Sequence, residues 1–154
     1  MRFCLVLAPL AVLLSVVGAS APSHAQSLTP TQLAQAVSGE EANRRGDAAY
    51  DRKDYAEAMR WYRLSAKEGY ALGEANIGFL YAKGFGVKQD FKESVRWYRM
   101  AAEKGQIEAQ HNLALKYFNG QGVAKDLAQA RYWMEKSAAG GDADAKQWLA
   151  DHPQ

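Results

Sequence analysis

Apolar and small side chains recur along this chain at the spacing of amphipathic helices, and glycines separate the helical segments. Between residues 94 and 102 they occupy positions i, i+3, i+4, i+7 and i+8: Ser94, Trp97, Tyr98, Ala101 and Ala102. The preceding helical segment, 71–83, ends at Gly84 and Gly86, because glycine tolerates the positive φ that leaves a helix. The pattern therefore predicts antiparallel helix pairs joined by short glycine turns.

The same pattern returns every 36 residues. Tryptophans and aspartates hold this register at Trp61, Trp97, Trp133, Asp54, Asp90 and Asp126. Other residue types share it at Tyr81 and Tyr117, Gly84 and Gly120, Gly86 and Gly122, Val87 and Val123, and at Gly69, Gly105 and Gly141. A period of this length indicates a solenoid, because two helices alone cannot bury their apolar faces and must stack on their neighbours.

Each aspartate of the register marks the start of the second helix in its unit. Asp90 is followed three residues later by Glu93, which predicts a capping-box-like pair. In such a pair one carboxylate accepts free backbone N–H groups and the other reaches back to the cap residue. The third residue after the other two aspartates is Glu57 or Gln129, so the same helix start is predicted three times.

These residues resemble the SEL-one-like repeat, a relative of the tetratricopeptide repeat, whose pattern is roughly A-x3-L-G-x2-Y-x2-G-x-G-V-x2-D-x3-A-x2-W-Y-x2-A-A-x2-G. Two consecutive units match it, with small substitutions such as Gly73, Ser94 and Ala114. The first unit departs further. Tyr50 lies close to Asp54 and the Gly-x-Gly-Val loop is missing, so this unit is more similar to an ordinary tetratricopeptide unit.

The resemblance implies an all-α fold, a right-handed α-solenoid of antiparallel helix pairs with about three repeats and a C-terminal capping helix. We expect the following division: a signal peptide at 1–25, an N-terminal segment at 26–39, a tetratricopeptide-like repeat at 40–70, SEL-one-like repeats at 71–106 and 107–142, and a capping half-repeat with its tail at 143–154. In the last of these, Trp148 is expected to cover the open end of the stack.

The N-terminus predicts export. Arg2 precedes an almost wholly apolar run at 3–17, and small residues stand at the −3 and −1 positions of a cleavage site after Ala25. We therefore expect a periplasmic or secreted protein. The alternative is a retained membrane anchor, because the run is only slightly shorter than a spanning helix of ~20 residues. Pro9 and the cleavage site favour removal.

Composition argues against several kinds of site. The single cysteine, Cys4, leaves with the signal peptide, so the mature chain has no thiol nucleophile, disulfide or thiolate zinc site. Its 18 basic and 17 acidic residues nearly balance, so no excess of positive charge is available to bind nucleic acid or an anionic membrane. His111 stands alone in its predicted helix, without a second histidine nearby to complete a metal site. We expect no catalytic residue, cofactor or metal.

The resemblance implies a binding role, because the first helix of each pair lines the concave face of a tetratricopeptide-type stack. The residues expected on a peptide-binding groove are Leu72, Ala75, Asn76, Phe79, Lys83, Glu108, His111, Asn112, Leu115, Phe118 and Asn119. Burial of the aromatic residues would supply affinity, and Asn76, Asn112 and Lys83 would orient a protein or peptide partner. Alternatively, residues 26–38 of the chain itself occupy the groove.

Other functions remain open at the level of sequence. One is a cell-wall or β-lactam hydrolase, since cysteine-rich relatives of this repeat have been described as such, although the cysteine pairs of that branch are missing here. Another is a self-associating structural module. A basic edge at Arg60, Arg63, Arg96 and Arg99 suits an acidic partner, but the neighbouring acids Glu57, Glu93 and Glu103 favour a salt-bridged, solvated face.

Overall fold

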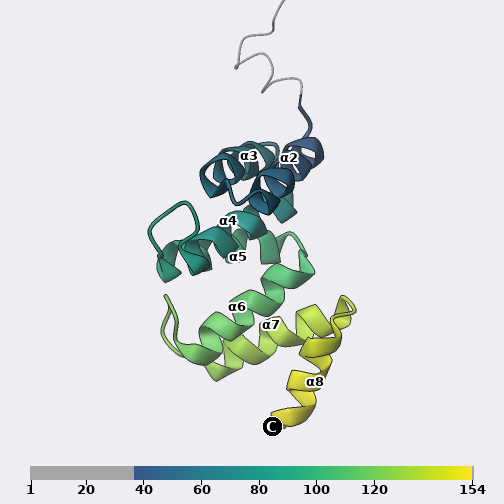
Figure 1. Cartoon of the computed structure of the whole chain (residues 1–154). Coiled ribbons are helices and arrows are strands. Elements are labelled where there is room, and N and C mark those ends of the chain that lie inside the picture. The colour runs from purple at the N-terminus through teal and green to yellow at the C-terminus, as the bar shows by residue number, and fades with distance from the viewer. Residues whose placement is uncertain (1–36, 154) are drawn as a thin grey trace, which may run out of the picture.

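The computed structural model describes residues 37–153 (Figure 1). This part of the chain contains seven helices and no strand: α2 (Gly39–Asp51), α3 (Tyr55–Lys67), α4 (Ala71–Lys83), α5 (Phe91–Glu103), α6 (Ile107–Asn119), α7 (Leu127–Ala139) and α8 (Ala143–Asp151). The signal peptide predicted at 1–25 and the segment that follows it, up to residue 36, lie outside the described residues.

The helices pack in chain order. Helices α2 and α3, α4 and α5, and α6 and α7 form pairs, each pair stacks on the next, and α8 packs on α7 (Figure 1). We call the first helix of each pair, together with α8, helix A, and the second helix B. The predicted all-α solenoid is confirmed, and the predicted helix at 71–83 coincides with α4.

The predicted start of each helix B is also confirmed. The carboxylates of Asp54, Asp90 and Asp126 accept the backbone N–H three residues later, at 3.0, 3.1 and 3.0 Å. The reciprocal half of the capping box does not form at Asp90. Its own N–H donates to the Tyr81 carbonyl at 3.0 Å, and the Glu93 carboxylate pairs with Arg96. The cap residue thereby ties the start of helix B to the end of helix A.

Close packing within each pair depends on matched sizes at one position of each helix. The Tyr98 ring lies on Gly78, where an added Cβ would stand 2.9 Å from the ring, and Tyr62 lies on Gly46 in the same way. In the third pair the corresponding residues are Met134 and Ala114, both fully buried in one cluster. A larger residue on helix A is thus accompanied by a more flexible one on helix B.

The glycine turns pack against the preceding pair. Gly86 has φ +67°, and a Cβ there would lie 2.7 Å from the Tyr55 carbonyl carbon. Gly122 has φ +75°, and its Cβ would overlap the backbone of Phe91. Glycine is required here for its backbone conformation and for the close approach, so these turns fix the spacing between successive pairs.

Candidate functional site

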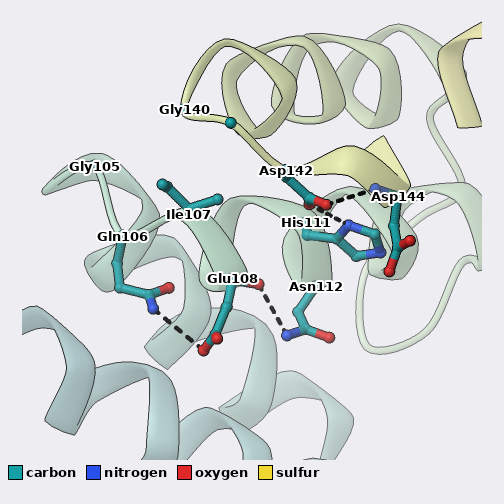
Figure 2. A pocket seen from close by; sticks show the side chains of 10 residues that line it. Gly105, Gln106, Ile107, Glu108, His111, Asn112, Gly140, Asp142 and Asp144 are labelled. Carbon is teal, nitrogen blue, oxygen red and sulfur yellow. Dashed lines mark hydrogen bonds and ion pairs between the residues drawn. The ribbon is translucent and has the colours of Figure 1, made fainter. Parts of the chain in front are cut away.

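A cleft opens where α6 begins and the α7–α8 turn passes over it (Figure 2). Its volume is about 770 Å³, and its lining residues are Gly105, Gln106, Ile107, Glu108, His111, Asn112, Gly140, Gly141, Asp142 and Asp144. We call it the α6–α8 cleft. Two of the groove residues predicted from sequence, His111 and Asn112, lie in it, as does Glu108.

A hydrogen-bonded cluster forms one wall of the cleft. The His111 Nδ1 atom lies 2.7 Å from Asp142 Oδ2, and the Ser137 hydroxyl donates to the same oxygen at 2.6 Å (Figure 2 shows the first contact). The other oxygen of Asp142 accepts the N–H groups of Asp144 and Ala145 at 2.9 and 3.1 Å, which caps α8. Asp142 therefore joins three helices through one carboxylate.

These contacts also determine the protonation state of Asp142. Burial alone would raise the pKa of Asp142, but hydrogen bonds from Ser137, the Ala145 backbone and His111 outweigh it and lower the pKa to about 2. Asp142 is therefore ionised at neutral pH.

Serine, histidine and aspartate meet here without the geometry of a catalytic triad. In a triad the histidine lies between the other two residues and takes the serine proton. Here Asp142 lies in the middle, and the Ser137 hydroxyl faces Asp142 and the Ile107 carbonyl, 3.1 Å away. Within residues 37–153 the Ser137 hydroxyl donates to no histidine, and the Asp142 carboxylate is a weak base because its pKa is lowered to about 2. The contacts of this cluster hold helices together, so it serves as a structural clamp.

Another stretch of the cleft wall offers groups that a partner can use. Asn112 donates its side-chain N–H to the Glu108 carbonyl at 2.9 Å, which holds the amide along α6 (Figure 2). Within residues 37–153 the Asn112 side-chain oxygen accepts no hydrogen bond. Ile107 is 37% exposed, and the carboxyl groups of Glu108 and Asp144 belong to exposed residues. The wall combines an apolar anchor, an amide and acidic groups.

Three of the five groove residues predicted on α4 are engaged within the fold. Ala75 is only 5% exposed and belongs to the core, so its predicted place on the groove is wrong. Asn76 donates to Asn43 at 3.0 Å. Phe79 packs edge-on against Tyr50 with ring centroids 6.0 Å apart. Leu72 is half-buried, and Lys83 holds its ammonium 5.7 Å from the Phe79 ring.

The residues predicted near the end of α6 form another separate environment. Phe118 packs edge-on against Trp148 and His152, with ring centroids 5.3 Å apart in each case. Leu115 packs on the apolar cluster beneath α8, and Asn119 is exposed. The structure thus places Glu108, His111 and Asn112 together in the cleft. Most of the other predicted residues pack within the fold, and Lys83 and Asn119 are exposed outside the cleft.

Sequence reasoning missed the residues that build the clamp. Asp142 stands immediately before a helical segment, which is a recognisable N-cap signal. Ser137 carried no such signal. The equivalent residue one helix pair back is Ala101. Only the packing of α7 on α6 brings the Ser137 hydroxyl to the Ile107 carbonyl.

Between residues 37 and 153, no group of three or more histidine, cysteine, aspartate or glutamate side chains is arranged to hold a metal ion. In the same part of the chain no helix has the length and apolar character needed to cross a membrane.

The family model of the Sel1 repeat matches residues 33–70, 71–106 and 107–142. The chain belongs to the Sel1 repeat family. Sel1 repeats generally mediate protein–protein interactions, so a scaffold for such interactions is the general role that family membership gives this chain. Comparison with the curated proteins gave no significant match.

Solved structures support the assignment to the Sel1 family. A Sel1 repeat protein from Oxalobacter formigenes is 34% identical, with a TM-score of 0.70, over 79% of this chain and 94% of that one. A protective antigen of uropathogenic Escherichia coli with an SLR fold is also 34% identical, with a TM-score of 0.67. That match covers 72% of this chain and 25% of the antigen, so this chain spans about a quarter of its length.

A third similar structure, cysteine-rich protein B of Helicobacter pylori, is 25% identical with a TM-score of 0.59, over 60% of this chain and 70% of that one. The Sel1 protein described here has no cysteine after Cys4. Its helix pairs are therefore held by packing, caps and hydrogen bonds such as those of Asp142, without disulfides between them.

Proposed function

We propose that this Sel1 repeat protein is exported and binds a protein partner at the α6–α8 cleft on its helix-A side. One observation carries the assignment: the cleft collects side chains that are not used in packing, while most of the other predicted groove residues are engaged within the fold. Within residues 37–153 the Asn112 side-chain oxygen accepts no hydrogen bond, and Ile107 remains 37% exposed. Such a combination suits an extended peptide segment or loop of another protein.

The geometry suggests how such a segment binds. The Asn112 side-chain oxygen accepts a backbone N–H of the partner, while its amide N–H stays on the Glu108 carbonyl. Ile107 buries an apolar partner side chain. Glu108 and Asp144 border the cleft and orient polar or basic groups of the partner. The clamp at Asp142 keeps this surface in place by holding the start of α8.

Export rests on the N-terminal sequence, in which Arg2, the apolar run and the cleavage site after Ala25 precede the repeats. Cell fractionation followed by N-terminal sequencing tests it. We expect a periplasmic or secreted product that begins at Gln26. A full-length product in the membrane fraction would instead show a retained anchor.

The experiment on binding uses the full-length chain with a C-terminal affinity tag, expressed in its own cells and captured after cross-linking. Asn112→Ala is expected to lose the captured partner. Asn119→Ala, which changes an exposed asparagine on the same helix, is the matched control and is expected to keep it. Phe79→Ala and Phe118→Ala are unsuitable probes, because both rings pack within the fold.

The opposite pattern, with the partner lost in Asn119→Ala and kept in Asn112→Ala, would move the contact to the far end of α6. Equal retention by both variants would remove the cleft as the site. Hydrolysis of a chromogenic β-lactam by the purified protein would contradict a binding role. We expect none, because Ser137 donates to Asp142, a weak base whose pKa is lowered to about 2, and not to a histidine.

A further inference from the structure

Two neighbouring depressions on the helix-B side form a second surface, remote in its residues from the α6–α8 cleft. The first lies between α3 and α5, has a volume of about 320 Å³, and is lined by Arg63, Lys67, Tyr81, Arg96, Trp97 and Met100 among others. The second, of about 750 Å³, lies along the start of α5. Tyr81 lines both, so they are neighbours. We call the two depressions together the helix-B groove.

The helix-B groove is strongly positive although the chain as a whole is nearly neutral, with a net charge of +2. Besides Arg63, Lys67 and Arg96, the second depression contributes Lys88 and Lys92. The charge is therefore concentrated locally, and a local concentration of one sign attracts a partner of the opposite sign.

The two acidic residues of the groove are already occupied. Asp90 caps α5 by accepting the N–H groups of Lys92 and Glu93 at 2.8 and 3.1 Å. Glu93 pairs with Arg96 at 2.9 Å. Within residues 37–153 no carboxylate pairs with Arg63 or Lys67. The salt-bridged face expected from sequence is thus formed only at Arg96, and the remaining cations are left for a ligand.

The floor of the groove is apolar and aromatic. The Arg96 guanidinium lies 4.6 Å from the centroid of the Trp97 ring, and Arg63 reaches the Tyr81 hydroxyl at 3.4 Å. Met100 lines the same depression. The Trp97 Nε1 atom is buried and has no hydrogen-bond partner in the described structure. A guanidinium is more weakly hydrated than an ammonium and its planar donors fit a carboxylate, so Arg63 suits an acidic ligand.

We infer that the helix-B groove binds an acidic segment of another protein, in which aspartate or glutamate residues alternate with apolar ones. The carboxylates pair with Arg63 and Lys67, and an apolar side chain packs on Trp97 and Met100. The chain's own N-terminus cannot be this ligand, because residues 1–36 contain no aspartate or glutamate. The inference concerns a different surface from the proposed cleft and does not depend on it.

A direct test measures binding of a fluorescein-labelled peptide of alternating glutamate and leucine to the full chain. We expect saturable binding that weakens as salt rises from 50 to 500 mM, since screening acts on exposed charges. The same peptide with glutamine in place of glutamate should not bind. The Arg63→Gln/Lys67→Gln double variant should lose about tenfold in affinity, which corresponds to ~1.4 kcal/mol.

Matched controls distinguish binding at the helix-B groove from a general effect of positive charge. Arg60→Gln, on the same helix but outside the groove lining, should change the affinity less than twofold. Asn112→Ala should leave peptide binding unchanged, so that failure of the cleft and failure of the groove are distinguishable. Trp97→Phe should abolish the ligand-induced change in tryptophan fluorescence.

Three results would overturn the inference. One is equal binding by the wild type and the Arg63→Gln/Lys67→Gln variant, with circular dichroism showing that both are folded. Another is an equal loss in Arg60→Gln, which would indicate a diffuse charge effect. The third is tighter binding to phosphatidylglycerol vesicles or a single-stranded oligonucleotide than to the peptide, which would assign the groove to a lipid surface or a nucleic acid.

Discussion

The Nδ1 atom of His111 on α6 lies 2.7 Å from the Oδ2 atom of Asp142, the residue that caps α8. This contact joins the middle of one helix-A segment to the start of the next. It holds the last helix of the described chain against the stack without a disulfide. Because the same side chains line the α6–α8 cleft, the stability of α8 and the shape of the candidate site depend on one carboxylate.

Removal of that carboxylate should loosen α8 selectively. Asp142→Ala loses the N-cap and the contacts with Ser137 and His111, and we expect the free energy of unfolding to fall by about 1–2 kcal/mol at pH 7. Amide hydrogen exchange should increase most in α8. Asp144→Ala, at an exposed position in the first turn of α8, is the control and should have a smaller effect. Equal loss of protection in α2 would argue against a local role.

The same contact predicts a pH dependence. Because the pKa of Asp142 is lowered to about 2 from an ordinary 3.8, its stabilising contribution is fully present above about pH 4. It is lost as the pH falls through 4 towards 2, where the carboxylate becomes protonated. The difference in urea midpoint between wild type and Asp142→Asn should therefore shrink over this range. A difference that stays constant from pH 6 to pH 2 would contradict the assigned contacts.

Alanine substitutions at two glycines should reduce stability by different amounts. Both Gly105 and Gly122 have positive φ, 88° and 75°, but only the Cβ added at Gly122 would overlap backbone. Gly105→Ala should cost about 1–2 kcal/mol from the left-handed conformation alone. Gly122→Ala should cost distinctly more, because the loop must move away from Phe91. Thermal unfolding of both variants tests this, and equal costs would show that the turn does not pack as described.

An ion pair in which only the carboxylate is buried gives a further prediction. The Lys104 ammonium lies 2.7 Å from Glu74, whose side chain is 2% exposed, and the second carboxyl oxygen of Glu74 has no partner in the described structure. Lys104→Ala leaves a buried carboxylate unpaired and should reduce the free energy of unfolding by about 2 kcal/mol. Urea denaturation measures the change.

A second substitution should recover most of the free energy of unfolding that Lys104→Ala loses. Gln110 occupies the position of Glu74 in the next unit, where its amide donates to the Ala102 carbonyl at 3.2 Å. Glu74→Gln in the Lys104→Ala background removes the charge and allows the equivalent bond to Ala66. No recovery in the double variant would show that the lost stability does not come from the unpaired carboxylate.

Residues close together in the sequence determine where most of the helices begin and end. A helix starts where an aspartate can accept free N–H groups, and it ends where glycine permits positive φ, so the helix of residues 71–83 and the caps at Asp54, Asp90 and Asp126 were predictable. The repeat then dictated stacking, because each pair leaves an apolar face uncovered. These features depend on neighbours within a few residues or on a fixed period.

Tertiary structure decided which of the predicted groove residues remain available. Helical periodicity placed Ala75, Phe79 and His111 on similar faces, but it does not show which face the next helix covers. Stacking buries Ala75 and surrounds Phe79 with aromatic rings, while the α7–α8 turn leaves a cleft beside His111. The clamp at Asp142 and the helix-B groove arise in the same way, because their members come from different helices and meet only when the pairs stack.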